Sequence, residues 1–170
     1  MHPTVVTFLI IKENIMKIKV ELAINKSIQE VWEVMGNQYG YANIWSSNFK
    51  TSKPGGEAKF NGLEYSLRDT TTDRGNTIQE LTAFDPEKYT LSYVITKGAP
   101  EIAEMAGAEW SLISKGENAT MLSMDFIMEP KMPLNEEMET KLKMGLTASV
   151  KELAEELKFY MENGKSLIKN

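Results

Sequence analysis

The feature of the sequence that most constrains the fold is a long amphipathic stretch at residues 134–163. On a helical wheel, one stripe of this stretch is largely apolar and the opposite stripe is charged, which predicts a single helix. The apolar stripe, interrupted by two small residues, consists of Met138, Leu142, Gly145, Leu146, Ser149, Leu153, Leu157 and Tyr160. Asn135 is a suitable N-cap, and Gly164 marks the end. Such a helix would be about 45 Å long, enough to cross a small sheet.

Composition and charge exclude several classes of function. A chain of 170 residues with 42% apolar and 25% charged residues is typical of one globular domain. The net charge of −5, without a basic run, argues against nucleic acid as a partner. The chain has no cysteine, and its only histidine is His2. Thiolate catalysis, a Ser/His/Asp triad and a zinc cluster therefore drop out, and we predict no metal and no cofactor.

The first fifteen residues include an apolar run at residues 5–11. This run is too short to span a bilayer and lacks the features of a signal peptide, so we expect no integral membrane segment and a cytoplasmic location. We interpret residues 1–15 as an N-terminal extension, either flexible or an upstream-start artefact, with an extra strand or a dimer contact as the alternative. The domain then spans residues 16–164, and residues 165–170 form a tail.

The remaining chain reads as strands and short helices. Clean alternation predicts a strand at 17–24, and Ser27 with Glu30 forms a capping box that opens a short helix ending at Gly36. A second short helix or irregular turn follows at 37–46. Further strands are predicted at 49–53, 63–67, 78–84, 89–96, 110–114 and 122–128, with turns between them and a longer interruption at 98–107. Leu63, Tyr65 and Leu67 alternate with Glu64, Ser66 and Arg68, which assigns Arg68 to the face opposite Tyr65. The prediction is an α+β fold with a seven-stranded antiparallel meander.

This order of elements resembles the helix-grip fold of the START-like superfamily, also called SRPBCC, which includes the polyketide cyclase/dehydrase and birch-pollen-allergen-like proteins. The residues that carry the resemblance are the opening helix at 27–32 with its Val31-Trp32 pair, Trp45 after the second helix, and a central hairpin with residues 78–81, Asp85, Tyr93 and Gly98. The resemblance implies a curved antiparallel sheet wrapped around the long C-terminal helix, with two short helices after the first strand and a cavity between sheet and helix.

If the apolar face of each strand points inward, a set of side chains converges on that cavity. The predicted ligand-binding residues are Trp45, Tyr65, Glu80, Tyr93, Met105, Trp110, Met124, Met138, Leu142 and Gly145, with Trp45 and Met105 near the mouth. A mainly apolar pocket with a few polar groups is typical of small-molecule sites. The alternative is an interior filled by large side chains. Glu80 is the candidate catalytic residue, but its strand does not alternate cleanly, so its inward or outward orientation stays open.

Three functions are compatible with these patterns. The first is binding of a small hydrophobic or amphipathic ligand, such as a lipid, a polyketide-like molecule or an isoprenoid. The second is a metal-free cyclase or dehydratase in which Glu80 works with Tyr65, Tyr93 or Arg68. The third is a regulatory module that binds another protein. Whether the protein is a monomer or a homodimer stays open.

Overall fold

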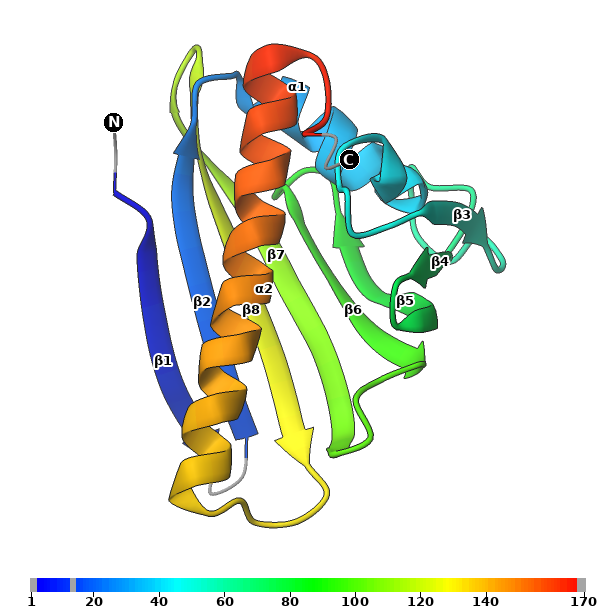
Figure 1. The fold of residues 1–170 in the computed structure, drawn as a ribbon. Coiled ribbons are helices and arrows are strands. Elements are labelled where there is room, and N and C mark those ends of the chain that lie inside the picture. The colour runs from blue at the N-terminus through cyan, green and yellow to red at the C-terminus, as the bar shows by residue number, and fades with distance from the viewer. Residues whose placement is uncertain (1–2, 13–14, 168–170) are drawn as a thin grey trace.

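Strands that alternate buried and exposed side chains build one curved antiparallel sheet. The computed structural model describes residues 3–12 and 15–167. Within them, the strands are β1 (Val5–Lys12), β2 (Ile15–Ile24), β3 (Thr51–Gly55), β4 (Leu67–Thr72), β5 (Gly75–Asp85), β6 (Thr90–Lys97), β7 (Ala103–Gly116) and β8 (Ala119–Pro130). They lie in the order β1-β2-β8-β7-β6-β5-β4-β3, which forms an eight-stranded sheet. The α+β helix-grip architecture is confirmed (Figure 1).

Strand β2 illustrates how the sequence pattern sets the two faces of the sheet. Its side chains alternate between intermediate and buried along its whole length, and Ile18 and Val20 are completely buried on the concave face. On the convex face, the Lys17 ammonium lies 3.2 Å from a carboxylate oxygen of Asp125. This neighbour belongs to β8, which pairs with β2 along most of its length.

The strand count differs from the predicted seven because β1 adds an eighth strand. β1 pairs antiparallel with β2, with Phe8 opposite Ile18, at one edge of the sheet. It lies in the segment that we interpreted as an N-terminal extension. Residues 1–2 and 13–14 of that segment, and residues 168–170 of the predicted tail, lie outside the described residues.

The short helices begin where the capping box predicts. The Ser27 hydroxyl accepts a hydrogen bond from the backbone N–H of Glu30, whose carboxylate accepts one from the backbone N–H of Ser27. Helix α1 (Ile28–Trp32) runs into a single π-helical turn, η1 (Glu33–Asn37), and a 3-10 segment, η2 (Tyr39–Ile44), follows. The expected helix end at Gly36 is therefore wrong. A Cβ on Gly36 would lie 2.4 Å from the Trp32 ring, so this glycine makes room for the indole.

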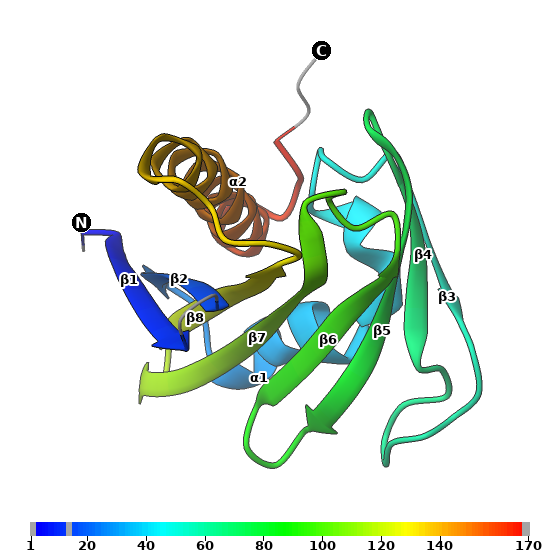
Figure 2. The same ribbon diagram turned by 90° about the horizontal axis from the view of Figure 1, so that it is seen from below.

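Helix α2 (Glu136–Asn163) has the predicted caps. The Asn135 side chain accepts a hydrogen bond from the backbone N–H of Met138, and Gly164 ends the helix with φ of 71°. The helix crosses the concave side of the sheet over β2 and β8 (Figures 1 and 2). Its C-terminal half is the better buried, and Ala154 and Leu157 are completely inaccessible. Strands β4 and β3 lie at the opposite end of the sheet from α2, and the sheet curls there toward the side on which the helix lies (Figure 2).

Candidate functional site

A buried arginine lies on the concave face of the sheet, on the strand next to the edge strand β3. Arg68 belongs to β4, lies opposite Gln79 of β5, and is 1% exposed. Its neighbour Asp69 points to the other face and is exposed. The predicted orientation of Arg68 is thus wrong. The chain at residues 63–66 is not a strand, and β4 begins only at Leu67, so the parity counted from Leu63 does not carry through.

The guanidinium of Arg68 makes two hydrogen bonds to protein groups. Its Nε–H donates to Oε1 of Gln79 at 2.8 Å, and Nη1 donates to the backbone oxygen of Tyr39 at 3.2 Å. The Tyr39 hydroxyl in turn donates to the backbone oxygen of Gln79 at 3.1 Å. Nη2 of Arg68 is buried and has no hydrogen-bond partner among the described residues. A buried donor without an acceptor is costly, and the phenol of Tyr93 is a polar group that interacts with this side chain.

Aromatic rings surround the same guanidinium. Its Cζ lies 4.1 Å from the ring centroid of Tyr39, and 5.2, 5.2 and 5.3 Å from those of Phe49, Tyr93 and Trp110. These contacts are within the range in which a cation is attracted to an aromatic face. We call the set Tyr39, Phe49, Arg68, Gln79, Tyr93 and Trp110 the Arg68 cluster.

Within residues 3–12 and 15–167, no acid forms an ion pair that balances the charge of the Arg68 cluster. Among the described residues, no carboxylate forms a salt bridge with Arg68. Burial raises the pKa of both Tyr39 and Tyr93 above the usual value, although the nearby Arg68 charge and, for Tyr93, a hydrogen-bonding interaction with the Arg68 side chain act in the opposite direction. Both phenols are therefore neutral near pH 7 and supply no negative charge. The cluster carries one positive charge in the protein interior, which the aromatic rings offset only in part.

Several predicted site residues meet in this region. The Trp45 and Trp110 ring centroids are 6.3 Å apart, and those of Tyr93 and Trp110 are 5.5 Å apart, both edge-on. Met124 is completely buried and pairs with Trp110 across β7 and β8. The interior here is packed with large side chains, so these residues form a solid aromatic wall.

Tyr65 has a positioning role next to this wall. Its hydroxyl donates to the backbone oxygen of Asn37 at 3.0 Å and accepts from the backbone N–H of Gly40 at 2.8 Å. These two bonds fasten the junction between η1 and η2. Partial burial raises the pKa of the phenol. Tyr65 thereby supports the segment that presents Tyr39 to Arg68.

The structure places Glu80 outside the candidate site. Its carboxylate lies 3.1 Å from the Lys59 ammonium, and its side chain is 34% exposed. Because Gln79 points inward to Arg68, the next residue of the strand points to the opposite face. A shift of register between Leu81 and Ala83 explains why the alternation of β5 was mixed. The burial that an acid–base role for Glu80 requires is absent.

The remaining predicted residues lie away from the Arg68 cluster. Met105 is only partly buried and follows the exposed Glu104 on β7. Leu142 packs on a separate small cluster of Ala103, Ala106 and Met128. Met138 is 46% exposed, and a Cβ added to Gly145 would have no atom within 4 Å.

Met138, Gly145, Ser149 and Glu156 share one face of α2, because residues separated by four or seven positions lie on one side of a helix. We call these four residues the α2 stripe. Its two ends differ, since Met138, Gly145 and Ser149 are exposed while Glu156 is 2% exposed. The stripe is therefore covered at the C-terminal end of the helix and uncovered along the rest.

Glu156 fastens α2 to the loop that carries Phe49. Its carboxylate accepts hydrogen bonds from the backbone N–H of Ser47, from the side-chain amide of Asn48 at 3.3 Å and from the Ser46 hydroxyl at 3.4 Å. Glu156 was not among the predicted site residues, although its spacing from Ser149 and Gly145 on the helical wheel places it on the same face of the helix.

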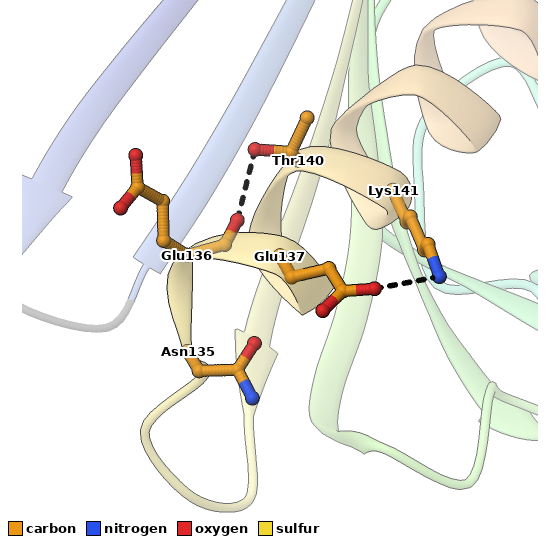
Figure 3. Close-up of a pocket in the computed structure, with 5 residues that line it drawn as sticks. All are labelled: Asn135, Glu136, Glu137, Thr140 and Lys141. Carbon is orange, nitrogen blue, oxygen red and sulfur yellow. Dashed lines mark hydrogen bonds and ion pairs between the residues drawn. The ribbon is translucent and has the colours of Figure 1, made fainter.

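Three hollows of the surface lie away from the Arg68 cluster. One of about 580 Å³, at the start of α2, is lined by Asn135, Glu136, Glu137, Thr140 and Lys141 (Figure 3). Its polar groups interact within the helix, since the Thr140 hydroxyl donates to the backbone oxygen of Glu136 and Lys141 pairs with Glu137. The second, of about 450 Å³, lies between Phe8 of β1 and Met144 on the opposite side of α2. The third, of about 270 Å³, lies over Glu109 and Asp125 on the convex face of the sheet.

Of the helices within residues 3–12 and 15–167, none combines the length and the apolar character needed to cross a membrane. Within that part of the chain, no group of three or more His, Cys, Asp or Glu side chains is arranged to hold a metal ion.

Comparison with solved structures identifies the fold. The chain is similar to a START superfamily protein from Mycobacterium smegmatis, with a TM-score of 0.70 and 16% identity over 88% of this chain and 99% of that one. It is also similar to the protein XoxI from Bacillus cereus, with a TM-score of 0.65 and 15% identity over 86% and 96% of the two chains. A third similar structure, an uncharacterised protein from Bacillus thuringiensis, has a TM-score of 0.60 and 16% identity over 83% and 98%.

Comparison at the level of sequence identifies the family. A search of curated proteins finds no match. The family model described as "Polyketide cyclase / dehydrase and lipid transport" matches residues 16–162. This range runs from the start of β2 almost to the end of α2 and includes every residue of the Arg68 cluster and of the α2 stripe. With its START-like fold and a match over most of its length, the chain belongs to the polyketide cyclase / dehydrase and lipid transport family.

Proposed function

We propose that the protein binds a small hydrophobic or amphipathic molecule, such as a lipid, a polyketide-like aromatic or an isoprenoid, between the curved sheet and α2. The observation that carries this proposal is the uncovered part of the α2 stripe. Met138, Gly145 and Ser149 lie on the face that Glu156 directs toward the curved side of the sheet, yet they are exposed. An apolar ligand along this face would cover it.

The surroundings of the stripe suit such a ligand. Leu142 and Leu146 flank it and pack on the small side chains of Ala103 and Ala106. The aromatic wall around Trp110 lies further into the concave face. Apolar and aromatic walls with a few fixed polar groups are the usual composition of a small-molecule site.

The other two functions have less support. A cyclase or dehydratase built on Glu80 is not proposed, because that carboxylate pairs with Lys59 on the convex face. A protein-binding module has no particular observation in its favour. The family description includes both cyclisation and lipid transport, and binding of an apolar molecule is common to both.

The test is titration of the protein with the neutral fluorescent dye Nile red. We expect micromolar binding to the unchanged protein. Gly145→Phe and Leu142→Trp should weaken it by about tenfold or more, equivalent to at least about 1.4 kcal/mol, because each fills space beside the stripe.

Met144→Phe is the matched control, since it adds a similar ring on the opposite side of the same helix, where Met144 is 69% exposed. It should leave the affinity unchanged. Absence of dye binding to the unchanged protein would contradict the proposal. A loss of binding in Met144→Phe alone would move the site to the hollow beside β1.

A further inference from the structure

The geometry points to an anionic group on the ligand, a carboxylate or a phosphate monoester, that binds the guanidinium of Arg68 inside the protein. This inference rests on the proposed function, because it assigns the chemical class of the molecule bound there. It concerns the group at the inner end of the ligand, whereas the proposed function concerns the apolar body.

Arg68 does not use all of its hydrogen-bond donors within the protein. A guanidinium has five N–H donors in a planar fork. One N–H goes from Nε to Gln79 and one from Nη1 to the backbone of Tyr39, while Nη2 has no partner among the described residues. One N–H of Nη1 and both of Nη2 remain, and two such N–H groups on neighbouring nitrogens can bind two oxygens of a carboxylate or phosphate.

The positive charge of Arg68 also requires a partner. A neutral carbonyl or hydroxyl group would satisfy a donor of Arg68 but would leave its charge uncompensated. Arg68 is 1% exposed and has no carboxylate partner within the described part of the chain, and the neighbouring phenols of Tyr39 and Tyr93 are kept neutral by burial. An anion from outside the chain would satisfy both the free donors and the charge.

The four rings around the guanidinium differ in their exposure to solvent. Of the four rings around Arg68, those of Tyr39, Tyr93 and Trp110 are buried, and only Phe49 is partly exposed. Phe49 follows the loop that Glu156 fastens to α2, and Glu156 belongs to the same stripe as Gly145 and Ser149. The inner end of a ligand along the uncovered stripe would point toward this loop, and displacement of the Phe49 ring would open the way to the guanidinium.

The experiment compares three ligands with one apolar chain and different head groups: decanoate, decyl phosphate and decanol. Affinities are measured by displacement of Nile red at pH 7.5 for the unchanged protein, Arg68→Gln, Arg68→Met and Arg74→Gln. Arg74 is exposed in the turn between β4 and β5 and controls for a general loss of positive charge. Circular dichroism and thermal unfolding establish that each variant is folded.

We expect the unchanged protein and Arg74→Gln to bind at least one of the two anions about tenfold to hundredfold more tightly than decanol. Both Arg68 variants should lose this preference while their affinity for decanol changes less than about threefold, a difference below about 0.7 kcal/mol. Arg68→Met fills most of the volume of the side chain, and Arg68→Gln keeps a hydrogen-bonding group. The two variants differ in how they could affect folding, and a result from either folded variant tests the proposal.

The outcomes separate the two proposals. Equal affinity for anions and decanol in the unchanged protein, or a preference that survives in a folded Arg68 variant, overturns the anion site while the proposed function stands. No binding of any ligand or of Nile red overturns the proposed function itself. Preference for decanoate over decyl phosphate assigns a fatty-acid-like ligand, and the reverse assigns a phosphate head group.

Discussion

At the scale of single residues, the protein buries two opposite charges in different ways. Arg68 and Glu156 are the most deeply buried charged side chains among the described residues, at 1% and 2% exposed. They do not pair with each other. The Glu156 carboxylate receives three hydrogen bonds from one loop, whereas the Arg68 guanidinium keeps free donors. Glu156 is thus satisfied by the protein, whereas Arg68 keeps donors for the anion that we propose.

This difference predicts the effect of Glu156→Gln. The amide keeps one acceptor oxygen but turns an NH₂ group toward the donors of Ser47 and Asn48. We expect the free energy of unfolding to fall by about 1–3 kcal/mol, because a buried donor is left unpaired. Urea denaturation measures this loss, and amide hydrogen exchange should be faster at Ser47.

Glu155→Gln is the control for that substitution. Glu155 is exposed and lies 4.0 Å from Lys151, so its removal should change the free energy of unfolding by less than about 0.5 kcal/mol. If the two substitutions lower the free energy of unfolding equally, the hydrogen bonds from Glu156 to the loop do not stabilise the folded protein.

At the scale of elements, the sequence predicted well those parts whose pattern is local. Helix α2, its caps, the capping box of α1 and strands β2, β6 and β8 each follow from periodicity within one segment. The orientation of Arg68 and Glu80 was not predictable in this way. It depends on where β4 begins and on a register shift in β5, and both are set by contacts with neighbouring strands.

The same limit applies to the candidate site. Trp45, Tyr93, Trp110 and Met124 were predicted because large apolar residues at inward positions share a core. Arg68 was considered only as a possible partner of Glu80, since a charged residue is seldom expected in an apolar interior. The packing of Met138 and Gly145 depends on how closely α2 approaches the sheet, which the helical pattern does not specify.

The capping box of α1 predicts a pH dependence. Hydrogen bonds from the backbone and the hydroxyl of Ser27 lower the pKa of Glu30 below its usual value. A lowered pKa means that the ionised Glu30 stabilises the folded protein above the pKa of the unfolded chain. That contribution is lost as the pH falls through the lower pKa of the folded state.

Comparison of the protein with Glu30→Gln measures this effect. The urea midpoint of the unchanged protein should exceed that of the variant at pH 7, and the difference should shrink as the pH falls to about 3, below the unperturbed range of a glutamate. A difference that is independent of pH would contradict a role for the ionised carboxylate.

At the scale of the whole molecule, strand β1 lies at the edge of the sheet and outside the range that the family model matches. The family match begins at residue 16, and β1 pairs only with β2. Val6 nonetheless packs on the core, and Phe8 is 51% exposed beside α2. The Arg68 cluster lies on β4 to β7 and the segments before β3, away from this edge.

We therefore expect a protein that starts at Met16 to fold and to keep the environment of Trp45 and Trp110, seen as an unchanged near-ultraviolet circular dichroism spectrum. Its free energy of unfolding and its urea m-value should both be lower, because less surface is buried on folding. Loss of the near-ultraviolet signal would show instead that β1 is essential to the domain.

The pairing of β2 with β8 also has a consequence for synthesis of the chain. Met16 lies opposite Met128, so one of the first strands to leave the ribosome finds its central neighbour only when almost the whole sheet has been made. Strands β3 to β7 pair with neighbours close in sequence and can assemble during translation. Contacts between distant segments are slow to form, so joining the β1–β2 hairpin to β8 is the late event. The apolar face of β2 therefore stays exposed until β8 has been synthesised. Such exposed surface is prone to aggregation and is the kind of surface that a nascent-chain chaperone covers.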